Sequence, residues 1–223
     1  MKQTLFITGT DTGVGKTVLT ALLTRFLRER GVNAAALKPV CSGGRADARA
    51  LHAAMNDALT LDEINPWHFR APIAPVLAAR WENRRVKKSE ALAHIRGLQK
   101  RFDLLVVEGA GGLLSPLGEN LNSRDLITAL RATPIIVAPN KLGVMNHLLL
   151  TLEALPENLR AKARVVLVMP PKPDAASKTN ADLLAEFFDA KRIFSLPWLG
   201  KNFDVEPALK KARVQRVLRA LAQ

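Results

Sequence analysis

The stretch GTDTGVGKT at residues 9–17 is the most informative part of this sequence because of what surrounds it. The apolar run LFIT at residues 5–8 precedes it and predicts a buried strand. Residues 16–30 follow it, and their apolar positions recur at the spacing of a helix. A glycine-rich turn between a strand and a helix presents backbone N–H groups to an anion. The stretch therefore predicts a P-loop, with Lys16 reaching the β and γ phosphates and the Thr17 hydroxyl binding Mg²⁺.

This loop is a variant of the usual P-loop pattern, G-x-x-x-x-G-K-[ST]. The position that should hold the first glycine is occupied by Thr10, and the nearest upstream glycine, Gly9, lies one residue farther away. A structural turn is the alternative interpretation. Because strand, glycines, Lys-Thr and helix occur in the expected order, we interpret residues 9–17 as a P-loop.

The rest of the chain alternates short apolar runs with longer helical patterns. Such alternation predicts a mostly parallel sheet covered by helices on both faces. We expect a three-layer α/β fold of the P-loop NTPase type, in a single domain over residues 1–223, since no linker divides the chain. Further strands are predicted at residues 32–37, 104–107, 135–138, 165–168 and 193–196. Further helices are predicted at residues 47–55, 74–81, 90–102, 124–130, 146–155, 180–188 and 207–221, with Ser89 and Ser123 as N-caps.

Charge and composition exclude several classes of protein. The 33 Lys and Arg residues exceed the 20 Asp and Glu residues, which gives a net charge of +13. The basic residues form no long consecutive block, and the aromatic residues, 5% of the chain, are not interleaved with them as a base-stacking surface requires. We interpret the charge as a solvated basic surface and expect no nucleic-acid binding and no membrane binding.

Cysteine content and apolar run length indicate the compartment. The single cysteine, Cys41, cannot form an internal disulfide or a CxxC site, and we expect it to fill space rather than to react. The apolar run at residues 5–8 is too short for a signal-peptide core, and no other run approaches the ~20 residues of a membrane span. We therefore expect a cytoplasmic protein. The 4 histidines show no metal-ligand spacing.

Residues that follow the strands are candidate site residues, because ligands bind beyond the carboxyl ends of an open parallel sheet. Lys38 follows the second strand and could offset charge that develops during phosphoryl transfer, although a surface lysine before a turn is the alternative. Asp47 begins the next helix as an N-cap or as a metal ligand, and spacing alone favours the cap. Glu108 follows the apolar run at residues 104–107 and is typical of a Mg²⁺ ligand in P-loop enzymes.

Four motifs taken together resemble a known family, the dethiobiotin synthetases. They are GTDTGVGKT, KPVCSG at residues 38–43, VEGAGG at residues 107–112 and KLGVMNH at residues 141–147, in this order. A weaker likeness extends to INPW at residues 64–67 and LPWL at residues 196–199, so the resemblance covers most of the chain. A P-loop alone would not distinguish this family from other nucleotide-binding enzymes, whereas the set of motifs is specific.

This resemblance implies an ATP-dependent ring closure in biotin biosynthesis. In that reaction CO₂ adds to one amine of 7,8-diaminopelargonate, and the nucleotide phosphorylates the resulting carbamate. The other amine then closes the ureido ring as phosphate leaves. The resemblance further implies Mg²⁺ as a cofactor and a homodimer with its sites at the subunit interface.

The resemblance also implies roles for individual residues. The phosphates would be bound by Gly13, Val14, Gly15, Lys16, Thr17 and Val18, and Mg²⁺ by Thr17, Asp47 and Glu108. The catalytic residues would be Lys16 and Lys38, which neutralise the carbamate and the transferred phosphoryl group, together with Thr12. The substrate would contact Lys38 and Ser42, a channel lined by Gly109, Ala110 and Gly111, and, through its carboxylate, Leu142, Gly143 and Asn146 of the partner subunit. The nucleotide-binding set also includes Pro170, Pro197, Trp198 and Leu199.

One departure from the family concerns the nucleobase. Relatives commonly have an Ala-Asn-Asp-type turn after the fifth strand, with the Asn reading the adenine edge, whereas this chain has MPP at residues 169–171. Proline has neither a side-chain amide nor a backbone N–H, so base-specific hydrogen bonds must be lost or replaced by backbone carbonyls. A relaxed or non-adenine nucleotide preference is our hypothesis.

Two alternative functions were weighed against this family. A cobyrinate-synthetase-like ligase would activate a carboxylate for amidation, but it normally carries a glutaminase region for which 223 residues leave no room. A partner-binding ATPase of the partitioning type would use the basic surface on DNA or membrane. Such proteins usually carry a second lysine near the start of the loop, where this chain has Thr10, Asp11 and Thr12.

Overall fold

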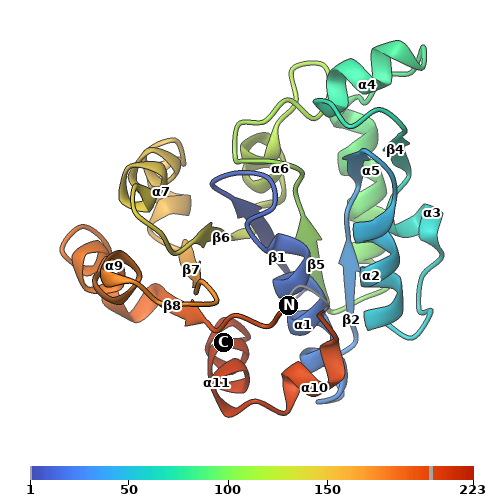
Figure 1. Cartoon of the computed structure of the whole chain (residues 1–223). Coiled ribbons are helices and arrows are strands. Elements are labelled where there is room, and N and C mark those ends of the chain that lie inside the picture. Colours follow the sequence, from blue (N-terminus) through green and yellow to red (C-terminus); the bar gives the residue numbers. More distant parts are fainter. Residues whose placement is uncertain (1, 201–202) are drawn as a thin grey trace.

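A parallel sheet forms the centre of the computed structural model, which describes residues 2–200 and 203–223 and within them has six strands in this sheet (Figure 1). The strand order is β2-β5-β1-β6-β7-β8, and neighbouring strands are parallel. The P-loop strand β1 therefore lies inside the sheet, between β5 and β6. The strand bounds are β1 (Gln3–Gly9), β2 (Ala34–Leu37), β5 (Leu104–Glu108), β6 (Thr133–Pro139), β7 (Arg164–Val168) and β8 (Ile193–Leu196).

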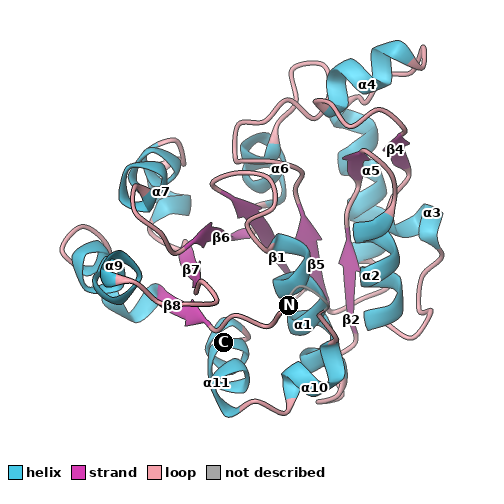
Figure 2. Ribbon diagram, viewed as in Figure 1, coloured by secondary structure: helices cyan, strands magenta, loops and turns pink. Residues whose placement is uncertain are grey.

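Helices cover both faces of this sheet, because successive strand residues point to opposite sides (Figure 2). Leu5 and Ile7 of β1 belong to a core shared with α1 (Lys16–Arg28), α10 (Val205–Leu209) and α11 (Ala212–Leu221). Phe6, between them, belongs to the core on the opposite face. That core includes residues of α2 (Ala46–Ala54), α3 (Leu61–Ile64), α4 (Pro75–Trp81), α5 (Lys88–Gln99), α6 (Ser123–Leu130), α7 (Val144–Glu153), α8 (Glu157–Arg160) and α9 (Ala175–Ala185). The predicted three-layer α/β fold is confirmed.

A small second sheet was not predicted from the sequence. In it β3 (Val40–Ser42) pairs in parallel with β4 (Trp67–Phe69). Each strand has three residues, which is too short for apolar alternation to be recognised. Because β2 ends at Leu37, the turn that carries Lys38 connects the large sheet directly to the small one.

Several predicted boundaries are corrected by the structure. Helix α7 begins at Val144 and α9 at Ala175, both earlier than predicted. The stretch at residues 207–221 contains the end of α10 and the whole of α11, which are separated at residues 210–211. The short helices α3 and α8 were not predicted. Among the described helices, none is both long enough and apolar enough to cross a membrane.

Both predicted N-caps are wrong. Extended backbone ends at Lys87, so Ser89 lies within the first turn of α5. Helix α6 is capped by Asn122, whose Oδ1 accepts a hydrogen bond from the Asp125 N–H (3.1 Å), while Asp125 accepts one from the Asn122 N–H (3.0 Å). This reciprocal capping box satisfies two helix-end N–H groups, which a serine at residue 123 could not do. Ser123 Oγ is buried without a hydrogen-bond partner among the described residues.

We predict that Asn122→Ala lowers the free energy of unfolding by about 1 kcal/mol, because it removes the cap of α6. Ser123→Ala is the matched control, and it should change the free energy of unfolding by less than about 0.5 kcal/mol. Urea unfolding of both variants measures the difference. A larger loss for Ser123→Ala than for Asn122→Ala would contradict this assignment of the cap.

Candidate active site

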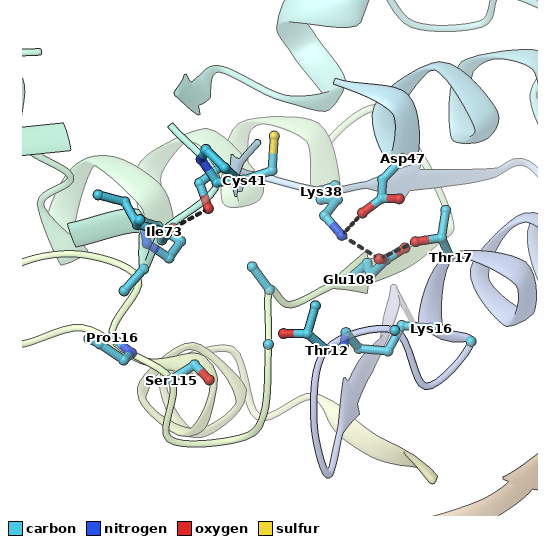
Figure 3. Close-up of a pocket in the computed structure, with 18 of the residues that line it drawn as sticks. Thr12, Lys16, Thr17, Lys38, Cys41, Asp47, Ile73, Glu108, Ser115 and Pro116 are labelled. Atoms are coloured by element: carbon cyan, nitrogen blue, oxygen red, sulfur yellow. Dashed lines mark hydrogen bonds and ion pairs between the residues drawn. The ribbon is translucent and has the colours of Figure 1, made fainter. Parts of the chain in front are cut away.

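Three neighbouring strands deliver the predicted site residues to one edge of the sheet. The P-loop follows β1, Lys38 follows β2 and Glu108 ends β5, and these strands are adjacent in the order β2-β5-β1. Beyond their carboxyl ends lies a cavity of about 700 Å³ (Figure 3). Its lining includes Thr12, Gly13, Gly15, Lys16, Thr17, Val18, Lys38, Cys41, Ser42, Asp47, Glu108, Ala110 and Gly111.

The P-loop has the backbone shape that anion binding requires. Gly15, at the N-cap position of α1, has φ 98°, a left-handed conformation that side-chain-bearing residues rarely adopt. Within the described residues no side chain caps the N–H groups at the start of α1, so they are available to a ligand. Lys16 Nζ donates a hydrogen bond to the Asp11 carbonyl oxygen (2.7 Å), which lies in the same loop. A bound phosphate would have to replace this contact.

Lys16 has an unusual protonation equilibrium. Its side chain is buried, at 6% exposure for the residue, and burial together with the nearby Lys38 charge lowers its pKa to about 8. Lys16 is therefore partly neutral at mildly alkaline pH. A ligand that brings negative charge to the loop favours the protonated form and raises the pKa.

Lys38 is buried between two carboxylates (Figure 3). Its Nζ donates to Glu108 Oε1 (2.6 Å) and also to Asp47 Oδ2. Glu108 Oε1 accepts a second hydrogen bond from Thr17 Oγ1 (2.7 Å), which joins the P-loop helix to the same group. Burial alone would lower the pKa of Lys38, but the Glu108 and Asp47 carboxylates together raise it above its ordinary value. Lys38 therefore stays charged, and because it is buried the alternative interpretation, a surface lysine before a turn, is wrong.

Asp47 is not a helix cap. Helix α2 has Arg45 at its N-cap position, and Asp47 lies in the first turn with its side chain 48% exposed, directed towards Lys38. Of the two interpretations that the sequence left open, the cap is wrong, because the helix starts one residue earlier than predicted. The metal-ligand interpretation stays a prediction.

The residues present are suited to Mg²⁺. Glu108 Oε2 is buried and has no hydrogen-bond partner among the described residues, although Oε1 of the same carboxylate has two. The Thr17 hydroxyl and the Asp47 carboxylate offer further oxygen atoms in the lining of the same cavity. The described part of the chain has no group of three or more His, Cys, Asp or Glu side chains that could hold a metal ion. Mg²⁺ accepts such a site, because it is bound through one or two carboxylates together with phosphate and water.

The residues at 109–111, directly after β5, lie in different environments. Ala110 and Gly111 line the cavity. At Gly111, whose φ is 66°, a Cβ would lie 2.4 Å from Ser115 Oγ, so a side chain there would be strained and would displace Ser115. Gly109 instead packs against Ser123 and Phe6, away from the cavity lining. Ser42 Oγ donates to the Ile73 carbonyl (2.6 Å), and its oxygen can still accept a hydrogen bond from a ligand.

A second cavity, of about 460 Å³, adjoins the P-loop on its other side. It is lined by the predicted residues Val14, Pro170, Pro197, Trp198 and Leu199, together with Gly13, Gly15 and Val18 of the loop. Its size and apolar lining suit a nucleoside.

Asn140, which also lines this second cavity, was not predicted as a site residue. Its amide donates to the Ser177 carbonyl (2.8 Å), and its Oδ1 accepts from Asn180 Nδ2 (2.8 Å). Asn140 is therefore already committed to fixing α9 against the end of β6, and only its position directly after a strand could have indicated it.

Only the start of the loop after β6, at Asn140 and Lys141, lines the second cavity. Leu142, Gly143 and Asn146 do not appear in the lining of either cavity, and Leu142 is 84% exposed. Sequence reasoning also missed cavity residues at the first residue of α4 and on irregular segments, where no motif marks them as site residues. These residues are Pro72, Ile73, Ala74, Pro75, Ser115 and Pro116.

The amino-acid sequence matches one family model and several related proteins. A family model described as an AAA domain matches residues 3–202. A protein of Akkermansia muciniphila described as ATP-dependent dethiobiotin synthetase BioD is 41% identical over 189 residues, which is 84% of this chain and 89% of that one. A protein with the same description from Anaeromyxobacter dehalogenans is 40% identical over 87% of this chain and 89% of its own length. Another, from Bacillus licheniformis, is 37% identical over 91% of this chain and 86% of its own length.

Structural comparison shows the fold. A crystal structure of a ParA family ATPase from Chlorobium tepidum TLS superposes with a TM-score of 0.65 and covers 100% of both chains, at 14% sequence identity. The similarity confirms the P-loop NTPase architecture, and at this identity it carries no further conclusion.

We predict that binding of a non-hydrolysable ATP analogue at pH 8 takes up about half a proton through Lys16, because its pKa near 8 rises when phosphates bind. At pH 6.5 Lys16 is already charged and should take up none. Calorimetry in two buffers of different ionisation enthalpy measures the uptake, with Lys16→Arg as the control that keeps its charge throughout. Equal uptake at pH 8 by both proteins would contradict the assignment.

Proposed function

The chain belongs to the dethiobiotin synthetase family, and on this premise we propose which of its residues perform the reaction. It is an ATP-dependent ligase of biotin biosynthesis. The observation that carries the proposal is the charged Lys38, buried between Glu108 and Asp47 beside the P-loop. The proposed substrates are 7,8-diaminopelargonate, CO₂ and a nucleoside triphosphate.

The triphosphate would bind along residues 13–18, against the free N–H groups at the start of α1. Lys16 would leave the Asp11 carbonyl and contact the β and γ phosphates, in keeping with its place beside the anion-binding turn. The nucleoside would enter the second cavity, between Val18 and the segment that carries Pro197 and Trp198.

Mg²⁺ would be held by Thr17, Asp47 and Glu108, which line the same cavity and include the unpartnered Glu108 Oε2. When bound, the ion supplies positive charge against the phosphate oxygens and fixes their orientation. The carboxylates of Glu108 and Asp47 are shared with Lys38 in the resting structure, so their charge is already held in place before the nucleotide arrives.

Lys38 and Lys16 would act together on the reacting group. The carbamate forms when one amine of the diamine attacks CO₂, and one of its oxygens then accepts the γ-phosphoryl group. Negative charge concentrates between the two lysines during this transfer, and a lysine that stays charged stabilises it. The second amine attacks the carbamate carbon, the C–O bond to phosphate breaks, and the ureido ring closes.

The diamine would lie on the side of the cavity formed by Thr12, Ser42, Ala110 and Gly111. The uncharged hydroxyl and backbone groups there can orient the amines of the diamine through hydrogen bonds.

We propose a homodimer in which Leu142, Gly143 and Asn146 of the partner subunit receive the substrate carboxylate. The exposure of Leu142 (84%) and Leu150 (62%) on one loop and the helix after it supports a contact with a second copy of the chain.

The reaction is tested by phosphate release from purified protein with Mg²⁺ and bicarbonate, with and without 7,8-diaminopelargonate, using ATP and CTP in parallel. We predict release that depends on the diamine. We also predict that ATP is preferred over CTP by less than about tenfold, equivalent to roughly 1.4 kcal/mol, since Pro170 supplies no base-reading amide. Release that ignores the diamine would contradict the proposed reaction and favour a partner-stimulated ATPase, and a stronger ATP preference would contradict only the nucleobase hypothesis.

Lys38→Ala should lower diamine-dependent turnover to a small residual rate, by about a hundredfold or more, while leaving nucleotide affinity within about threefold, because its charge serves the transferred group more than the bound triphosphate. Lys88→Ala, which removes a lysine with a 45% exposed side chain, is the surface control and should change neither quantity. Turnover assays and equilibrium nucleotide binding separate the two effects. Weakened binding with normal turnover would contradict the role of Lys38.

Glu108→Gln should raise the Mg²⁺ concentration needed for half-maximal activity by about tenfold or more, since it removes a charged oxygen ligand. Glu90→Gln, on the exposed surface of α5, is the matched control. A titration of activity with Mg²⁺ at saturating nucleotide makes the measurement, and an unchanged requirement in Glu108→Gln would remove this residue from the metal site.

A further inference from the structure

Asn65 is a fully buried polar residue that lines neither cavity. It lies between α3 and β4, with 0% exposure. A buried amide must find hydrogen-bond partners, because its desolvation is otherwise uncompensated. The partners of its side chain all lie in the segment that begins with Lys38. Its Nδ2 donates to the Lys38 carbonyl (2.7 Å) and, more weakly, to the Pro39 carbonyl (3.5 Å), and its Oδ1 accepts from Cys41 Sγ (3.1 Å).

Backbone bonds from the same short segment strengthen this connection. The Lys38 N–H donates to the Ile64 carbonyl (3.0 Å), and the Trp67 N–H donates to the Pro39 carbonyl (3.1 Å). Lys38 is thus held on its N–H side by Ile64 and on its carbonyl side by Asn65. The turn between β2 and β3, which is the base of the lysine side chain, is fixed in both position and direction.

The backbone of Asn65 also contacts the start of α2, which carries the second carboxylate. Arg45 Nη2 donates to the Asn65 carbonyl (3.1 Å), and it also reaches the Leu61 carbonyl (2.5 Å). Arg45 occupies the N-cap position of α2, two residues before Asp47. One residue therefore touches both chain segments whose side chains form the Lys38–Asp47 ion pair.

The Asn65 amide acts as both donor and acceptor in this arrangement. Its Nδ2 supplies the donor for the Lys38 carbonyl, whereas the Pro39 carbonyl also accepts from the Trp67 N–H and the Cys41 thiol also lies 3.1 Å from the Gly44 carbonyl. The backbone around it is equally constrained, since Pro66 follows and disfavours helical backbone at Asn65, whose φ is −141° and ψ 72°. An alanine would leave the Lys38 carbonyl without its side-chain donor.

We infer that Asn65 is a positioning residue for catalysis, which holds Lys38 so that its ammonium group lies between Glu108 and Asp47. It acts through Lys38 and does not touch substrate. This inference rests on the proposed role of Lys38 in carbamate phosphorylation. It explains why the small β3–β4 sheet exists beside the large one: β3, β4 and Asn65 form the support of the turn that carries the lysine.

The experiment combines Asn65→Ala with Lys38→Ala in a double-mutant cycle. Diamine-dependent kcat and the KM for ATP are measured for the parent protein, both single variants and the double variant. We expect Asn65→Ala to lower kcat by about tenfold or more with the KM for ATP within about threefold, since the lost alignment matters in the transition state. In the Lys38→Ala background the same change should alter the residual rate by less than about threefold, because the group it positions is already absent.

Thr60→Ala is the matched control for damage to the same segment. Thr60 caps α3 through Glu63, so its loss destabilises the helix that precedes Asn65 without touching the Lys38 turn. We expect a lower thermal midpoint for this variant, with kcat within about threefold of the parent value. Asn65→Ser, which keeps one hydroxyl donor, replaces Asn65→Ala if the alanine variant does not fold.

The outcomes distinguish a failure of the positioning role of Asn65 from a failure of the proposed role of Lys38. If Asn65→Ala lowers the rate by the same factor with and without Lys38, its effect is structural and the inference is overturned. A kcat for Asn65→Ala equal to that for Thr60→Ala overturns it as well. If Lys38→Ala itself retains full diamine-dependent turnover, the proposed role of Lys38 fails, and the positioning role fails with it.

Discussion

The burial of one lysine charge between two carboxylates is the constraint around which this site is built. Lys38 lies in the turn after β2, Glu108 ends β5 and Asp47 lies in α2, so their charged groups can meet only where these elements converge. A buried charge without a partner is strongly unfavourable, and removing one member of a buried pair typically costs about 3–5 kcal/mol. The parallel order β2-β5-β1 meets this requirement and brings Thr17 of the P-loop helix onto the same Glu108 oxygen.

The charged side chains that line the site have no net charge before ligands bind. Protonated Lys16 and Lys38 balance Asp47 and Glu108, and Lys16 is hydrogen-bonded to its own loop. A triphosphate adds several negative charges to this balanced group, so its binding favours a divalent cation and full protonation of Lys16. Glu108 Oε2 has no hydrogen-bond partner among the described residues, so a cation bound by it would leave the contact between Oε1 and Lys38 in place.

The sequence predicted those parts of the site that follow from regular structure. The P-loop and Glu108 follow buried strands, and the parallel-sheet rule places such residues at one edge. The sequence indicated no role for Asn65, although INPW at residues 64–67 belonged to the resemblance, and none for Asn140 or for the cavity residues at 72–75 and 115–116. These residues lie in or beside irregular segments or act through tertiary contacts. The cap of α6 was misplaced by one residue, since Ser and Asn are both good caps and only the reciprocal bond from Asp125 distinguishes them. Strands of three residues, such as β3 and β4, leave no periodicity to detect.

The most direct test of this account is a crystal structure with Mg²⁺, a non-hydrolysable ATP analogue and the diamine. The account predicts Mg²⁺ on Glu108 and Thr17, Lys16 moved from the Asp11 carbonyl to the phosphates, and Lys38 within hydrogen-bond distance of the γ-phosphate or the amine that forms the carbamate. A structure in which the analogue is bound, yet the metal ion lies away from Glu108 and Lys38 contacts neither group, would contradict it.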